Sequence, residues 1–161
     1  NILLIPVAIL KDRAFVGGKD YTDKGGRVAD FLYRNELTKN VFIIEIKTPL
    51  KKIIDTTTPY RKPDVFSIGK EVTGGLVQAL DQKDNLQKEF HTLAKGGEFV
   101  SFNPKVVLII GNLKSLSKKQ LKSFELFRSN IKDVEIITYD ELLTRTNLIL
   151  GEFVDTKKKK V

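Results

Sequence analysis

The sequence of 161 residues predicts an α/β fold, a mixed sheet flanked by helices. Three observations predict it. Residues 27–35 alternate in the way a strand does, residues 41–47 are apolar on both faces, and two later stretches repeat apolar residues at helical spacing. Strands come first and then alternate with helices, so we expect antiparallel strands followed by a right-handed crossover.

The N-terminal third predicts three strands. The stretch RAFVGG forms a short strand that Gly17 and Gly18 stop, whereas LIPVAIL before it is too short to classify by period. RVADFLYRN forms the second strand and VFIIEIK the third, which is apolar on both faces until Glu45 and therefore belongs in the centre of the sheet. The short link ELTKN between them favours an antiparallel hairpin.

A long loop and a long helix follow the third strand. Residues 48–66 hold three of the five prolines and three consecutive threonines, which indicates a loop at the mouth of a site. Helical spacing over residues 67–95 gives five apolar anchors: Leu76, Leu80, Leu86, Phe90 and Leu93. Gly74 and Gly75 cost this helix about 1 kcal/mol each relative to alanine, so we expect them at its first turn or at a close approach to another backbone.

The C-terminal part predicts two more strands and two more helices. The strands are KVVLIIG and VEIITY. We expect Ser117 to cap the helix SKKQLKSFELFRSNI and Asp140 to cap the helix DELLTRTNLIL. We assign residues 1–154 to one domain and residues 155–161, with the run Lys157–Lys160, to a solvated basic tail. The first residue is Asn1 and methionine is absent, so we expect a piece of a longer protein.

Composition narrows the function classes. The net charge of +8 and the isoelectric point near 9.6 favour a polyanionic partner, and nucleic acid first. The balance stays positive without the four terminal lysines. The absence of cysteine excludes disulfides, thiolate zinc sites and cysteine nucleophiles, and permits a cytoplasmic location. Apolar runs are far shorter than the roughly 20 residues that span a bilayer, so we expect no membrane partner.

The residues with the strongest chemical signal are Asp30, Glu45 and Lys47. Glu45 and Lys47 are two apart on one strand and project to the same face, and Asp30 lies in the strand that the hairpin brings alongside. Two carboxylates at one place repel unless a cation lies between them, so a Mg²⁺ or Mn²⁺ site is one interpretation, with Lys47 beside a phosphate. The alternative is an ion pair of Glu45 with Lys47 and a turn capped by Asp30.

A longer series of segments carries a resemblance to a known family. GGRVADFLYRN, FIIEIKTP, PYRKPDVFSIGKEVTGGLVQALDQKD, KVVLIIG and ITYDELL together resemble the nuclease domain of Shedu-type antiphage defence proteins, within the PD-(D/E)xK nuclease superfamily. The match covers residues 15–143. Two features depart from the superfamily pattern: Ala29 stands where the motif has proline, and the helix that normally opens the fold is not seen.

The resemblance implies a restriction-endonuclease-like fold and metal-dependent DNA cleavage. Asp30, Glu45 and Lys47 take the three motif positions, and Gln78 takes the place of a helical glutamine near the site, with Gln82 as the second candidate. The implied magnesium ligands are Asp30, Glu45 and the backbone carbonyl of Ile46.

Other motifs bear on the choice of function. Tyr60 and four basic residues of the loop are candidates for contacts with the DNA backbone, or equally for a solvated loop: Lys51, Lys52, Arg61 and Lys62. His91 is the single histidine, expected on the helix surface, which disfavours a histidine-bound metal. Neither a Gly-rich phosphate loop with lysine nor a GxSxG motif is present, which argues against nucleotide and serine hydrolases.

Two functions remain in competition at this stage. The first is a Mg²⁺-dependent DNA endonuclease domain in antiphage defence, acting as a homo-oligomer. The alternative is a non-catalytic domain that binds nucleic acid or serves as a scaffold in a defence assembly. Metal dependence separates them, because a binding module tolerates a chelator and shows only a salt-dependent affinity.

Overall fold

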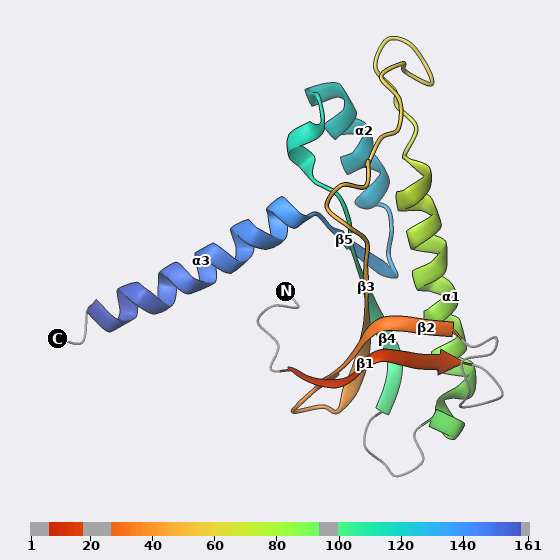
Figure 1. The fold of residues 1–161 in the computed structure, drawn as a ribbon, viewed down its shortest axis with the longest axis vertical. Coiled ribbons are helices and arrows are strands. Elements are labelled where there is room, and N and C mark those ends of the chain that lie inside the picture. The colour runs from red at the N-terminus through yellow and green to blue at the C-terminus, as the bar shows by residue number, and fades with distance from the viewer. Residues whose placement is uncertain (1–6, 18–26, 94–99, 159–161) are drawn as a thin grey trace.

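A computed structural model describes residues 7–17, 27–93 and 100–158 of the chain (Figure 1). Five strands form one sheet in the order β1-β2-β3-β4-β5, and the helices follow from the third strand onward. The elements are β1 (Val7–Gly17), β2 (Arg27–Asn35), β3 (Asn40–Ile46), α1 (Lys70–Leu93), β4 (Val100–Ile109), the 3-10 turn η2 (Leu113–Ser115), α2 (Lys118–Arg128), β5 (Val134–Ile137) and α3 (Tyr139–Lys158).

The pairing of the strands confirms the predicted mixed sheet. β1, β2 and β3 are antiparallel neighbours, whereas β3, β4 and β5 are parallel. β3 is therefore the middle strand, as its two apolar faces predict. The first strand begins at Val7, so the part of LIPVAIL that the structure describes belongs to it. The arrangement is compatible with a restriction-endonuclease-like fold.

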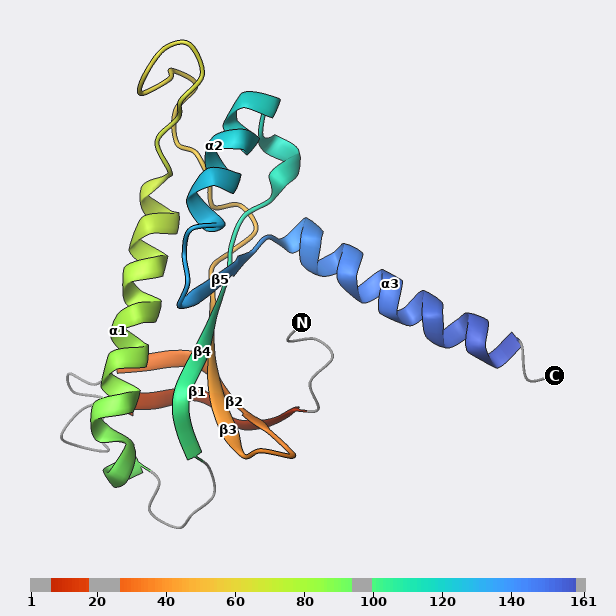
Figure 2. The same ribbon diagram turned by 180° about the vertical axis from the view of Figure 1, so that it is seen from behind.

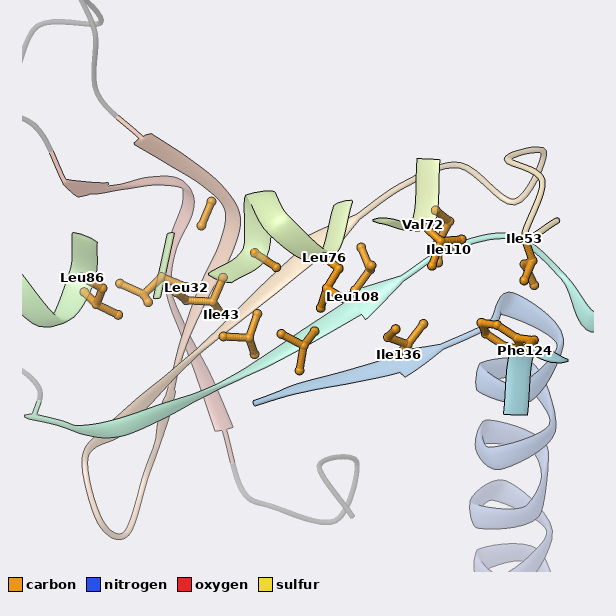
Figure 3. Close-up of a cluster of buried hydrophobic side chains, with 14 of the residues drawn as sticks. Leu32, Ile43, Ile53, Val72, Leu76, Leu86, Leu108, Ile110, Phe124 and Ile136 are labelled. Carbon is orange, nitrogen blue, oxygen red and sulfur yellow. The ribbon is translucent and has the colours of Figure 1, made fainter. Parts of the chain in front are cut away.

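The main core lies between one face of the sheet and the two helices α1 and α2 (Figure 3). The strands contribute alternate residues such as Ile43 of β3 and Leu108 of β4, as period-two side chains must when one face is covered. α2 contributes Phe124. The helix α1 contributes Val72, Leu76, Ala79 and Leu86.

One predicted anchor of α1 is wrong. Leu80 is 36% exposed, because the buried positions 72, 76, 79 and 86 follow a stripe that does not include it. Leu76 and Leu86 are confirmed as buried, whereas the side chains of Phe90, His91 and Leu93 lie outside the residues whose side chains the structure describes.

The opposite face of the sheet carries a smaller cluster. Val107, Ile109 and Ile137 are buried there, and partly buried Ile44, Ile46, Tyr139 and Leu142 pack against them. After this contact α3 leads away from the sheet (Figures 1 and 2). No helix in the described part of the chain combines the length and the apolar character needed to cross a bilayer.

The two predicted helix caps have different outcomes. Ser117 caps α2 in a capping box with Gln120, as predicted. Asp140 does not cap α3, because the helix begins one residue earlier, at Tyr139. The Asp140 carboxylate instead accepts hydrogen bonds from the backbone N–H groups of Leu113 and Lys114, so it ties η2 to α3. α3 runs to Lys158 and thus through the predicted boundary after residue 154, and the division into domain and tail stays a prediction.

Candidate active site

The hairpin of β2 and β3 positions the three residues singled out in the sequence. Phe31 pairs with Ile44 in an antiparallel register, and one step further along this ladder brings Asp30 opposite Glu45. Residues opposite each other project to the same face, so both carboxylates face the side of the sheet that α1 covers. Lys47 follows directly after the end of β3 on that same side.

Glu45 is the centre of a hydrogen-bond network that reaches α1. The residue is only 2% exposed. Its Oε1 accepts from Lys47 Nζ at 2.7 Å and from Gln78 Nε2 at 2.7 Å, and its Oε2 accepts from Gln82 Nε2 at 2.8 Å. Lys47 Nζ also donates to Gln78 Oε1 at 2.8 Å. A buried carboxylate with one cation and two amides around it is compensated and fixed in orientation.

Gln78 and Gln82 therefore both reach the site, although by different routes. Gln78, which the resemblance favoured, is an exposed residue, and neighbouring Val77 is 65% exposed. Its amide bridges Lys47 and Glu45 at the edge of the site. Gln82, one helical turn later, is the buried one at 1% exposure.

Gly75 explains how close α1 comes to the sheet. A β-carbon at this position would lie 3.2 Å from Leu108 Cδ1 and 3.6 Å from Lys47 Cε, whereas one at Gly74 would meet nothing within 4 Å. Gly75 thus lies at a close approach, but to side chains of the sheet and not, as was predicted, to another backbone. The absent side chain lets the helix bring its glutamines within hydrogen-bond distance of Glu45.

Asp30 is half-buried and fixes the backbone at the end of β3. Its Oδ2 accepts a hydrogen bond from the backbone N–H of Ile46 at 2.7 Å. Its other oxygen accepts no hydrogen bond from the part of the chain that the structure describes. Asp30 therefore orients the peptide next to the predicted carbonyl ligand.

Tyr139 is a residue of this site that the sequence analysis did not single out. Its hydroxyl donates to the backbone carbonyl of Lys47 at 2.8 Å, and the Lys47 N–H donates to the Ile109 carbonyl at 2.8 Å. Burial, and secondarily the charge of Asp30, raise the pKa of Tyr139 above its ordinary value. The available signal was its position just after β5, because parallel strands bring their carboxyl ends to one edge of a sheet.

The donor set fits a hard divalent cation. Asp30 and Glu45 offer carboxylate oxygens, which Mg²⁺ prefers, and Mg²⁺ binds through one or two carboxylates while keeping several waters. Among the described residues no group of three or more histidine, cysteine, aspartate or glutamate side chains is placed to bind a metal ion. The predicted set, two carboxylates and the Ile46 carbonyl, is smaller than such a group, and it stays a prediction.

The basic residues of the loop between β3 and α1 differ in their pairing. Lys51 forms an ion pair with Glu71 at 2.8 Å. Lys52, Arg61 and Lys62 are exposed and form no ion pair with any residue that the structure describes. Tyr60 between them is 82% exposed. The structure thus leaves three of the four predicted DNA contacts open to an anionic partner.

A mixed sheet whose central strand carries Glu45 near its end, hydrogen-bonded by Lys47 and two glutamines of α1, defines an α/β domain with a buried charged cluster at one edge of its sheet. Comparison with known proteins identifies its family. The family described as "Shedu protein SduA, C-terminal" matches residues 1–143, and the chain belongs to it. The Shedu protein SduA of Bacillus cereus (strain B4264) is 37% identical over 148 residues, which cover 87% of this chain and 38% of that relative.

Proposed function

We propose that this chain is a metal-dependent DNA endonuclease domain that hydrolyses phosphodiester bonds in antiphage defence. The observation that carries the proposal is the arrangement of Asp30, Glu45 and Lys47 at the end of the central strand, with Gln78 bridging the last two. The three residues take the motif positions of the PD-(D/E)xK pattern, which supports the proposal. Membership in the Shedu SduA family and the basic net charge support it.

Each residue has a defined part in this mechanism. Asp30, Glu45 and the backbone carbonyl of Ile46 would hold Mg²⁺ or Mn²⁺, which when bound neutralises phosphate charge and lowers the pKa of a water. Lys47 offsets negative charge that develops on the phosphate, because its ammonium lies beside Glu45 and its side chain is 24% exposed. Gln78 orients the Lys47 ammonium, and Gln82 fixes the Glu45 carboxylate from the buried side.

The direct test is a nuclease assay on linear and circular duplex DNA with magnesium, with manganese and with a chelator. Asp30→Ala, Glu45→Ala and Lys47→Ala are each expected to abolish cleavage while the circular dichroism spectrum stays that of the parent. Metal-dependent cutting that disappears in Glu45→Ala supports the assignment. Full nicking activity in Glu45→Ala would sink it.

A second function, nucleic-acid binding without cleavage, is favoured by one observation. Lys47, Gln78 and Gln82 already satisfy the Glu45 carboxylate without a metal ion. A scaffold within a larger assembly is consistent with the fact that the chain spans 38% of the relative it matches. A domain of this kind binds DNA in the presence of a chelator and does not cleave DNA with any metal ion.

The setting of the activity is part of the proposal. We expect the nuclease to act in the cytoplasm as a homo-oligomer, because cleavage of both strands of a duplex is served by two sites. Light scattering on the chain is the measurement, and a monomer at working concentration would contradict self-assembly through this domain alone.

A further inference from the structure

A group of lysines on η2 and α2 has no part in the proposed mechanism. Lys114, Lys118, Lys119 and Lys122 are all exposed. None of them forms an ion pair within the part of the chain that the structure describes. Lysines that form no ion pair repel one another, and a bound polyanion relieves that repulsion.

Direct contacts join this group to the loop between β3 and α1. Gln120 Nε2 donates to the Thr56 carbonyl at 3.2 Å, and the Phe66 N–H donates to Ser123 Oγ at 3.1 Å. Nearer the site, Asn112 Nδ2 donates to the Pro49 carbonyl at 2.9 Å. Both views show α2 and the loop side by side at the end of the molecule where α1 begins (Figures 1 and 2).

We call this region the basic end: the loop residues 48–70 with residues 112–122 of η2 and α2. The loop segment holds five basic and two acidic residues, and the second segment four basic and none acidic. Their combined charge is close to the +8 of the whole chain. Net positive charge therefore gathers at this end, directly beyond the strand end that carries Glu45 and Lys47.

We propose that the basic end binds the phosphate backbone of a DNA duplex, and that the lysines of α2 extend this contact beyond the loop. The proposal rests on the proposed function in that the bound duplex is the substrate of the site at Glu45. Lysines provide point charges for phosphates and select no base, so they position a duplex and do not read its sequence. Cations spread over a loop and a helix suit a polyanion better than a small anion.

The test is binding of a fluorescein-labelled DNA duplex of about three helical turns, roughly 30 base pairs. The fluorescence anisotropy of the labelled duplex is measured as the whole chain is added in the presence of a chelator, so that binding is followed without cleavage. The triple variant Lys118→Gln, Lys119→Gln, Lys122→Gln removes charge from the basic end. The matched control Lys39→Gln, Lys105→Gln, Lys132→Gln removes the same charge near the opposite ends of the strands.

We expect the α2 variant to bind the duplex about tenfold more weakly than the control. The slope of log Kd against the logarithm of the salt concentration should fall by about 2 to 3, because three phosphate contacts are lost. Equal binding by the two variants would overturn the proposal, and so would a wild-type chain that does not bind the duplex at low salt. If polyglutamate displaces the labelled duplex as efficiently as unlabelled DNA of equal charge does, the assignment to nucleic acid is overturned.

The same experiment separates this inference from the proposed function. If the wild-type chain binds the duplex through α2 but does not cleave it with any metal ion, the nuclease proposal is contradicted and the binding surface is supported. If the chain cleaves DNA but the two triple variants bind the duplex with equal affinity, the binding surface is contradicted and the nuclease proposal is supported.

Discussion

Two clusters of partly buried charge lie on this protein, and they are built differently. The site cluster consists of Asp30, Glu45, Lys47, Gln78 and Gln82. The junction cluster lies where β5 passes into α3. There the Arg128 guanidinium donates to both oxygens of Glu141, at 2.6 and 2.7 Å, and to both oxygens of Glu125, at 2.6 and 3.0 Å.

In the junction cluster the Glu141 carboxylate is fully hydrogen-bonded. Glu141 Oε2 also accepts from the Thr138 N–H at 3.0 Å and from the Thr138 hydroxyl at 2.9 Å. Hydrogen bonding to Glu141 raises the pKa of Arg128 above its ordinary value, against the opposing effect of burial. Burial alone would raise the pKa of Glu141, but the hydrogen bonds from Arg128 and Thr138 lower it. Such a cluster stabilises the fold and has little capacity left for a ligand.

The site cluster is less completely hydrogen-bonded among the residues that the structure describes, and we propose that it binds the metal ion and the phosphate. One Asp30 oxygen accepts no hydrogen bond among the described residues, and a flexible lysine, not a bidentate arginine, pairs with Glu45. The comparison teaches that a buried charge does not by itself mark a site. What marks it is buried charge together with unsatisfied acceptor capacity at a strand end.

The largest effects are expected when one glutamate in each cluster is replaced by glutamine. Glu45→Gln should lose at least about 100-fold in cleavage rate, because under the proposed function the variant lacks a carboxylate ligand of the metal ion. Glu141→Gln should keep the cleavage rate and lose about 1–3 kcal/mol of unfolding free energy, because it weakens a charged hydrogen-bond pair. Nuclease assays and urea unfolding of both variants are the measurements. The distinction fails if each variant changes both quantities equally.

A smaller effect is expected at Tyr139, the residue that connects α3 to the site. Tyr139→Phe removes the hydrogen bond to the Lys47 carbonyl and should lower kcat about tenfold at nearly unchanged KM, for a cost near 1 kcal/mol in stability. Tyr33→Phe is the control, because Tyr33 lies within β2 and its ring stacks on Phe42, with 5.3 Å between the ring centroids. A loss of stability in Tyr139→Phe without any change in kcat would reduce Tyr139 to a structural residue.

Acid should weaken the junction cluster through Glu141. Its pKa in the folded state lies below the reference value of 4.5, so its stabilisation is complete above the unfolded pKa and is lost as pH falls through the folded pKa. The stability difference between wild type and Glu141→Gln should therefore shrink below about pH 4.5. Urea unfolding from pH 7 downward measures it, with Glu135→Gln as the control. A difference that is constant with pH would contradict the coupling.

The smallest effect concerns the two adjacent glycines of α1. Gly74→Ala meets nothing within 4 Å and should stabilise the helix by up to about 1 kcal/mol. Gly75→Ala should gain less, because its β-carbon would lie 3.2 and 3.3 Å from the Leu108 methyls and these must shift. Thermal unfolding compares the pair, and an equal gain in both would show that the approach of α1 to the sheet is not tight.

The sequence by itself determined the local structure and part of the site. Alternation within 27–35 and the apolar run before Glu45 predicted the hairpin and the central strand, since side-chain direction in a strand depends only on its period of two. For the same reason Glu45 and Lys47 were predicted on one face. Ser117 was predicted as a cap because a cap involves only neighbouring residues.

Only the tertiary structure decided which distant residues complete the site. Gln82 and Leu80 lie on the same helix, and the way in which the crossover lays α1 on the sheet buries the glutamine against Glu45 and exposes the leucine. Tyr139 reaches Lys47 across 92 positions of the chain, because β5 ends beside β4 and β3 at the same edge of the sheet. Local periodicity carries no information about such contacts, since they depend on the pairing and packing of whole elements.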